Sequence, residues 1–268
     1  MINQMEQTEL SKMHAVAVHS EQAEEFATSY SDMNASAYST CFTYSRKRLD
    51  EWLERFLPAR GDGMRILDVG CGTGHHMARL KARGFIVAGV DGSDEMLRHA
   101  RANNPGAQIE KSDVENIPFD AGQFDFVLCV EVLRYLPDFS KCVGEMARVL
   151  KPGGTCLATA APLLNSNGYW LINRAASVIR ISNLVQLKQY FTTSGRLRRT
   201  FASAGFDRPE IHGVYIGGIN WAEHVAPRLL PRILKAWEPC DRAMADLPVF
   251  REFANMFVVR SQRESAGR

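Results

Sequence analysis

Three features that define other classes of protein are missing from this sequence: an excess of one charge, a long apolar run, and a metal-binding spacing of cysteines. Lysine and arginine number 32 against 30 aspartates and glutamates in 268 residues, which leaves a net charge of +2. This balance gives no electrostatic reason to expect a nucleic-acid partner. No stretch reaches the roughly 18 consecutive apolar residues that a membrane-spanning helix needs, so we expect no membrane span.

The cysteines show neither a CxxC motif nor a Cys/His spacing typical of metal sites, and the first residues contain no apolar run of the signal-peptide kind. The six cysteines are Cys41, Cys71, Cys129, Cys142, Cys156 and Cys240. We therefore expect no bound metal, reduced thiols and a cytoplasmic protein. With 46% apolar and 23% charged residues, the composition is that of a globular protein with a sizeable core.

Short apolar runs alternate with helical patterns from residue 64 onwards, which is typical of βαβ units and a doubly wound parallel sheet. The expected strands are residues 64–70, 85–91, 107–113, 124–132 and 155–162. The expected helices between them are residues 76–84, 93–103 and 139–154, the last closed by Pro-Gly-Gly. A helix over 194–206 and strands over 209–216 and 253–262 follow, with an amphipathic helix over 227–238.

The stretch LDVGCGTGHH, residues 67–76, has a glycine at every second position from Gly70 to Gly74. It follows an expected strand and opens a helix, so we expect backbone N–H groups and the positive end of the helix dipole to favour an anion there. The spacing GxGxG differs from the GxGxxG of dinucleotide-binding folds and so disfavours NAD. Asp91 ends the second strand 17 residues after Gly74 and is suited to accept both hydroxyls of a ribose.

Four motifs in register make a resemblance specific: LDVGCGTG, VAGVDGSDEML, KSDVENIPFDAGQFDFVLCVEVLRYLPD and ARVLKPGG. Over residues 64–161, and more weakly to 262, the chain closely resembles the class I S-adenosylmethionine-dependent methyltransferases, in particular the ubiquinone/menaquinone-biosynthesis-like "methyltransferase type 11" group. The resemblance implies a Rossmann-like seven-stranded sheet and S-adenosylmethionine as cofactor. It also implies this division: an N-terminal helical lid (1–57), a cofactor-binding core (58–161), a substrate-capping insertion (162–193), the C-terminal part of the sheet with the amphipathic helix (194–262) and a tail (263–268).

The resemblance also implies a set of cofactor-binding residues. The turn and Asp68 would line the methionine part, Asp91 would hold the ribose, and Asp113 would accept from the adenine amino group. The full set is Asp68, Gly70, Cys71, Gly72, Gly74, Asp91, Gly92, Ser93, Met96, Asp113, Val114, Cys129 and Val130. Single members of this set also have structural alternatives. The glycines could merely close a turn, and Asp91 and Asp113 could cap helices. Met96 could be a core residue, and Cys71 and Cys129 are more typical of packing residues than of nucleophiles.

No residue stands out as a catalyst. Methyl transfer from a sulfonium is an in-line displacement, so alignment and exclusion of water can supply much of the catalysis. A hydroxyl or phenol acceptor would also need a base. The candidates are His76, Glu131 and His212, with His14 and His19 in a lid; many relatives have paired histidines where this chain has Arg134 and Tyr135.

We expect methyl transfer to a small molecule, most readily at oxygen. Three alternatives stay open: methylation of protein or RNA, a catalytically inactive cofactor-binding partner subunit, and an NAD-type oxidoreductase. Residues 1–20 are polar and without clear period, so we expect a flexible leader or part of a lid, and residues 21–57 suggest two helices joined by a loop. The sequence leaves the choice between a monomer and a homodimer open.

Overall fold

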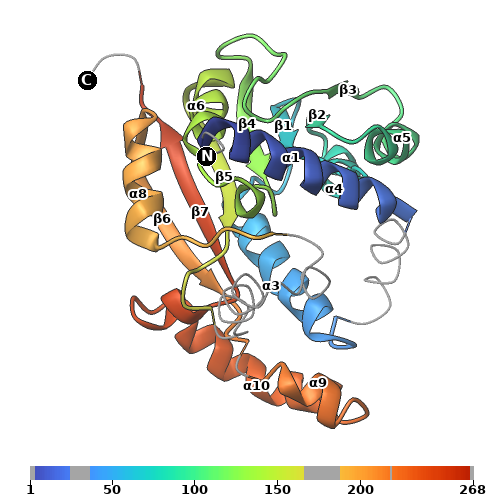
Figure 1. The fold of residues 1–268 in the computed structure, drawn as a ribbon, viewed down its shortest axis with the longest axis vertical. Coiled ribbons are helices and arrows are strands. Elements are labelled where there is room, and N and C mark those ends of the chain that lie inside the picture. The colour runs from blue at the N-terminus through green and yellow to red at the C-terminus, as the bar shows by residue number, and fades with distance from the viewer. Residues whose placement is uncertain (1–3, 25–36, 166–187, 218, 266–268) are drawn as a thin grey trace.

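A seven-stranded sheet forms the centre of the structure, a computed structural model that describes residues 4–24, 37–165, 188–217 and 219–265. Within these residues the strand order is β3-β2-β1-β4-β5-β7-β6 (Figure 1). The strands are β1 Arg65–Val69, β2 Ile86–Asp91, β3 Gln108–Lys111, β4 Phe124–Cys129, β5 Leu150–Ala160, β6 Phe206–Val214 and β7 Met256–Arg263. The expected Rossmann-like seven-stranded α/β fold is confirmed.

The first five strands run parallel, and β7 runs antiparallel between β5 and β6. Strand β1 pairs with β2 on one side and with β4 on the other, so the chain order reverses beside β1. In open α/β sheets, ligands bind at the carboxyl ends of the strands where this reversal opens a crevice. The topology therefore places the site at the ends of β1, β2 and β4.

Helices cover both faces of the sheet because alternate strand residues point to opposite sides. Leu67, Val127 and Cys129 face one core with helices α6 (Ser140–Val149) and α8 (Ser194–Ser203). Ile66 and Leu128 face the other core. That second face is covered by α3 (Cys41–Phe56), α4 (His75–Ala82), α5 (Asp94–Asn103) and α10 (Leu230–Met244).

Side-chain caps define where several of these helices begin. Thr40, Ser93 and Thr193 each accept the N–H of the residue three positions further on, at the starts of α3, α5 and α8. The shorter elements are α9 (Trp221–Val225) and the 3₁₀ turns η1 (Leu133–Tyr135) and η2 (Phe250–Phe253). No helix in the described part of the chain is long and apolar enough to cross a membrane.

Helix α1 (Gln4–Glu21) occupies most of the segment for which the sequence predicted a flexible leader or part of a lid. Figure 1 shows it crossing the sheet from the region of α6 to α5. Hydrogen bonds of 2.7 Å join Ser11 to Tyr190 and Ser20 to Ser93, and an ion pair joins Lys12 to Asp113. The helix forms because distant parts of the chain bind it, which the local pattern does not reveal.

Several boundaries also differ from the sequence-based expectation. Strand β4 ends at Cys129 rather than at 132, because Glu131 takes a left-handed φ of 62° and η1 follows. Helix α6 ends at Val149, and the Pro-Gly-Gly stretch belongs to β5. The first of the two helices expected over residues 21–57 centres on Phe26 and Tyr30, which lie outside the described residues.

Candidate active site

A cavity of about 780 Å³ lies at the carboxyl edge of the sheet, beneath α1. Its volume falls in the range of roughly 300–1,000 Å³ typical of small-molecule sites. Most of the expected cofactor residues line it: Asp68, Gly70, Cys71, Gly72, Asp91, Gly92, Met96, Asp113, Val114 and Val130. The fold thus brings together residues from the ends of β1, β2, β3 and β4.

Three residues of the expected set lie outside the cavity lining. Gly74 begins α4, and its carbonyl accepts from the amide of Asn104 at 3.0 Å. Ser93 caps α5. Cys129 is fully buried in the core on the α6 side of the sheet. Each of them supports the shape of the site through packing or hydrogen bonding.

The glycine turn depends on backbone conformations that other residues avoid. Gly70, Gly72 and Gly74 have φ values of 72°, 51° and 76°, in the left-handed region. A Cβ on Gly70 would also lie 2.3 Å from Cγ2 of Val132, so a side chain does not fit there. The turn therefore needs glycine for both its path and its packing.

Four N–H groups of this turn are used within the protein, so these four do not converge on an anion as expected. Those of Gly70 and Cys71 donate to the carbonyl of Val90 at 2.8 and 2.9 Å, and that of Gly74 donates to the carbonyl of Cys71. The N–H of Gly72 donates to Asp91 at 2.9 Å. For these four groups, the role is to fix the turn against β2.

Two buried carboxyl groups dominate the electrostatics beside the turn. Asp68 is 2% exposed, and its Oδ2 has no hydrogen-bond partner among the described residues. Burial, together with the charge of Asp91, raises the pKa of Asp68 to about 7. Burial also raises the pKa of Asp91, although its carboxylate accepts N–H groups from Gly72 and Ser93. Such a pair favours a ligand that carries positive charge and hydroxyl donors, which fits a cofactor with an ammonium, a sulfonium and a ribose.

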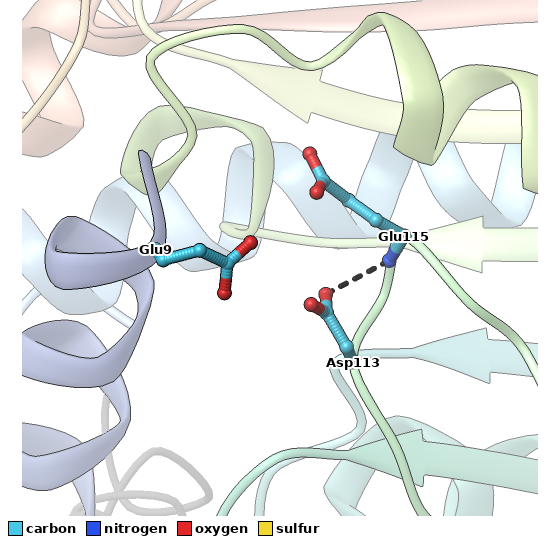
Figure 2. Close-up of side chains that lie close together, drawn as sticks. All are labelled: Glu9, Asp113 and Glu115. Carbon is cyan, nitrogen blue, oxygen red and sulfur yellow. Dashed lines mark hydrogen bonds between the residues drawn. The ribbon is translucent and has the colours of Figure 1, made fainter. Parts of the chain in front are cut away.

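A cluster of carboxylates closes the cavity at the end of β3. Figure 2 shows Glu9 of α1 facing Asp113 and Glu115, with Asp113 accepting the N–H of Glu115 at 3.0 Å. The Lys12 ammonium bonds to all three carboxylates, at 2.7, 2.6 and 2.8 Å respectively. Burial alone would lower the pKa of Lys12, but these bonds hold it above its ordinary value. The cluster therefore already contains its cation, and it joins α1 to the cavity.

The opposite end of the cavity is lined by titratable side chains near the end of β4. Glu131 forms an ion pair with Arg134, and its N–H donates to Oγ1 of Thr159 at 2.7 Å. Burial would raise the pKa of Glu131, but Arg134 and Arg46 outweigh burial and lower it. Burial and Arg46 also lower the pKa of His76 to about 3. Neither group is suited to take a proton near neutral pH.

His212 lies away from the cavity, which corrects the catalytic role considered for it. Its Nδ1 donates to the carboxylate of Asp246 at 3.0 Å. Its ring stacks on Trp52 with a centroid distance of 4.4 Å and contacts Phe56. His212 therefore joins β6 to α3 as a structural residue.

Residues from α1 and α3 complete the lining and were not in the expected set. Lys12, Val16 and His19 share one face of α1 at helical spacing, and Arg46 comes from α3. Their spacing of four and three residues was the available signal. This signal is weak, because the polar sequence of α1 does not indicate which face of the helix packs on the rest of the protein.

Sequence comparison gives the same picture as the geometry. Residues 67–158 match the family model described as "Methyltransferase domain". A malonyl-[acyl-carrier protein] O-methyltransferase of Erwinia pyrifoliae is 31% identical over 172 residues, which cover 63% of this chain and 64% of that protein. A ubiquinone biosynthesis O-methyltransferase of Psychrobacter arcticus is 30% identical over 161 residues, which cover 57% of this chain and 63% of that protein. The matched part thus spans less than two thirds of the length of both relatives.

Structural comparison extends over nearly the whole chain. A crystal structure of a SAM-dependent methyltransferase from Thermotoga maritima has a TM-score of 0.60 at 18% identity. The alignment covers 92% of this chain and 99% of the other. Residues 67–158 are thus similar to a methyltransferase domain, and the chain has the fold of the S-adenosylmethionine-dependent methyltransferases.

Proposed function

We propose that this protein transfers a methyl group from S-adenosylmethionine to an oxygen atom of a small molecule. The observation that supports it best is a cavity of about 780 Å³, which is lined by the buried acids Asp68 and Asp91 and, near the end of β4, by Glu131. The two curated relatives named above are both called O-methyltransferases, which favours oxygen as the acceptor atom.

The residues present suit the cofactor in three places. Asp68, whose Oδ2 is buried and lacks a partner, would bind the ammonium of the methionine part. Asp91 would accept the ribose hydroxyls, since each carboxylate oxygen can accept more than the one N–H it now receives. Asp113 and Val114 would border the adenine. When bound, the cofactor supplies a methyl group on a positively charged sulfur.

The chain's own contribution is to align the acceptor and exclude water. Helix α1 covers the cavity, which favours a small molecule over a protein or RNA acceptor. In this proposal residues 1–57 act as the lid, 58–161 as the cofactor-binding core and 162–193 as the substrate cap. Gln189 and Tyr190, at the end of that cap, hydrogen-bond to Arg134 beside the cavity.

Calorimetric titration with S-adenosylhomocysteine, with NAD as the control ligand, tests the cofactor. We expect binding of the former alone. The variant Asp91→Ala should lose about 2 kcal/mol of binding free energy, roughly 30-fold in affinity, through loss of a charge-assisted ribose contact. Glu95→Ala is the matched control. It removes an exposed carboxylate from α5, the helix that follows Asp91 in the chain, and Glu95 lies outside the cavity lining.

Transfer of a labelled methyl group from S-adenosylmethionine to a panel of phenols, alcohols and carboxylic acids tests the reaction. We expect label in an ether or ester product. Folded protein that binds NAD instead, or an Asp91→Ala variant with unchanged affinity, would contradict the assignment of the cofactor site. Label that enters only protein or RNA would contradict a small-molecule acceptor.

A further inference from the structure

Of the two lid histidines that the sequence offered, helix α1 brings His19 into the cavity lining. His19 lies in the last turn of α1 and lines the cavity. Its ring meets that of Tyr135 edge-on, with a centroid distance of 4.9 Å. Tyr135 belongs to η1, directly after β4, and also lines the cavity. His19 therefore lies on the acceptor side of the site.

The His19 imidazole acts electrostatically on acidic residues at the ends of two strands. Positive charge on His19 lowers the pKa of both Asp91, at the end of β2, and Glu131, just after β4. Coulomb interactions of this kind act over a few ångströms in a partly buried site. The imidazole is thus within electrostatic range of both the carboxylate proposed for the ribose, Asp91, and Glu131.

One hydrogen bond determines which ring nitrogen can accept a proton. Nδ1 of His19 is 2.7 Å from the carbonyl oxygen of Ala15. A carbonyl only accepts, so Nδ1 must carry the hydrogen, and in the neutral ring the basic lone pair lies on Nε2. The same bond fixes the orientation of the ring relative to α1.

Contacts on either side of His19 hold α1 in place. The Lys12 ammonium bonds to Asp113 and Glu115, and Ser20 bonds to Ser93 at 2.7 Å. Between them, α1 approaches the chain so closely that a Cβ on Gly92 would lie 2.9 Å from Cγ2 of Val16. A base held by fixed contacts on both sides is positioned for proton transfer before the acceptor arrives.

We infer that His19 is the general base of the reaction, carried into the site by the lid helix. The inference rests on the proposed transfer to a hydroxyl or phenol. The acceptor O–H bond breaks, its proton forms a bond to Nε2 of His19, and the electron pair of that bond stays on the acceptor oxygen. That pair then forms the O–C bond to the methyl group while the sulfonium takes the C–S pair, and the imidazolium returns its proton to water. Imidazole is suited to this step, whereas the depressed pKa of His76 and the ion pair of Glu131 with Arg134 disfavour those two.

A chromogenic phenol tests proton transfer without turnover. The protein is saturated with S-adenosylhomocysteine and titrated with 4-nitrocatechol, about one pH unit below the pKa of the free probe, so that the free probe is mainly neutral. An imidazolium that faces the bound phenolate should lower the pKa of the probe by about one unit or more, and so raise the ionised fraction about fivefold. We expect wild-type protein to show this rise in phenolate absorbance.

Two variants separate a base from a packing residue. His19→Gln should bind the probe but leave it neutral. His14→Gln, a matched change at an exposed position of the same helix outside the cavity lining, should behave as wild type. Equal phenolate absorbance in His19→Gln and wild type would overturn the inference while leaving the proposed function intact. Wild-type protein that binds S-adenosylhomocysteine but not the phenol would overturn both the phenolic acceptor and its base.

A measurement on the wild-type protein tests the inference even if the His19→Gln variant fails to fold. Nitrogen-15 spectra of the wild-type imidazoles should show His19 as the Nδ1–H tautomer in the cofactor-product complex. They should show it as imidazolium once 4-nitrocatechol is bound. A ring that stays neutral while the bound probe is ionised would overturn the inference.

Discussion

The ionised carboxyl of Asp68 is buried, and its Oδ2 has no hydrogen-bond partner among the described residues, so removal of its charge should stabilise the ligand-free protein. The change is Asp68→Asn, which keeps the shape of the side chain and removes its charge. The carboxyl is 2% exposed and its Oδ2 has no hydrogen-bond partner among the described residues. We expect the variant to be more stable than wild type above neutral pH and to bind S-adenosylhomocysteine more weakly.

The magnitude follows from the pKa of Asp68, which burial and the charge of Asp91 raise from 3.8 to about 7. At about 1.36 kcal/mol per pKa unit, ionised Asp68 costs up to about 4 kcal/mol at pH 8. The amide of the variant leaves polar groups unsatisfied, at a cost of about 1–3 kcal/mol. The net gain should be about 2 kcal/mol, or roughly 4–8 °C in melting temperature for a chain of this size.

The raised pKa of Asp68 also determines how the stability difference between variant and wild type changes with pH. Between pH 3.8 and about 7 the folded protein holds the Asp68 proton that the unfolded chain has lost, so wild-type stability falls as pH rises through this window. The variant lacks that loss, so its stability relative to wild type should rise from a deficit of about 1–3 kcal/mol near pH 4, set by the unsatisfied amide, to a gain of about 2 kcal/mol above pH 7. Urea unfolding at several pH values measures it.

Asp125→Asn is the matched control, with the opposite sign. Burial would raise the pKa of Asp125, but bonds from Lys151 at 2.7 Å and from the N–H of Arg65 at 2.8 Å outweigh burial and lower it. Its charge therefore stabilises the folded state above the unfolded pKa, and the variant should be less stable than wild type at pH 8. A wild-type advantage over Asp68→Asn at pH 8, or a difference that does not change with pH, would refute the reasoning.

Two further predictions concern the lid and the turn. Lys12→Met leaves three carboxylates facing one another, so we expect S-adenosylhomocysteine to dissociate about tenfold faster, as measured by stopped-flow. If the association rate is unchanged, this is a loss of about 1.4 kcal/mol in binding free energy. An unchanged dissociation rate would mean that α1 does not gate release. Gly70→Ala places a methyl group 2.3 Å from Val132 at a φ of 72°, and should cost about 2–4 kcal/mol in urea unfolding. Combining it with Val132→Ala should cost less than the sum of the two changes, and strict additivity would refute the contact.

Most of the sheet could be predicted from the sequence because its strands are apolar runs bounded by turn residues. The errors lie where tertiary contacts override local signals. Pro-Gly-Gly predicts an end to structure, but these residues lie within β5, between Leu150 and Thr155, which both pair with β4. Helix α1 has few apolar residues of its own, and its partners Asp113 and Tyr190 lie about 100 and 180 positions further along the chain. No local pattern contains that information.

The positions of the acids in the site were predictable, but their partners were not. Parallel strands bring their carboxyl ends to one edge, so Asp68, Asp91 and Asp113 had to lie near one another. That Lys12 would bond to Asp113, and that the turn N–H groups would bond to Val90 and Asp91, depends on distances that only the folded chain defines. The same holds for His19, whose place beside Tyr135 follows from how α1 lies on the sheet.

The charges around the cavity lower the stability of the ligand-free protein. Asp68 and Asp91 are close enough for Asp91 to raise the pKa of Asp68, and the turn supplies no cation to either. Arg46 and Arg134 lie at the other end, beside Glu131. A cationic ligand beside Asp68 and Asp91 would relieve the repulsion between these two carboxylates. Part of the binding free energy of such a ligand would therefore come from repulsion that is already present in the free protein. Under the proposed function, selection for binding and selection for stability act in opposite directions at Asp68, because the ligand would supply the partner that its Oδ2 lacks among the described residues.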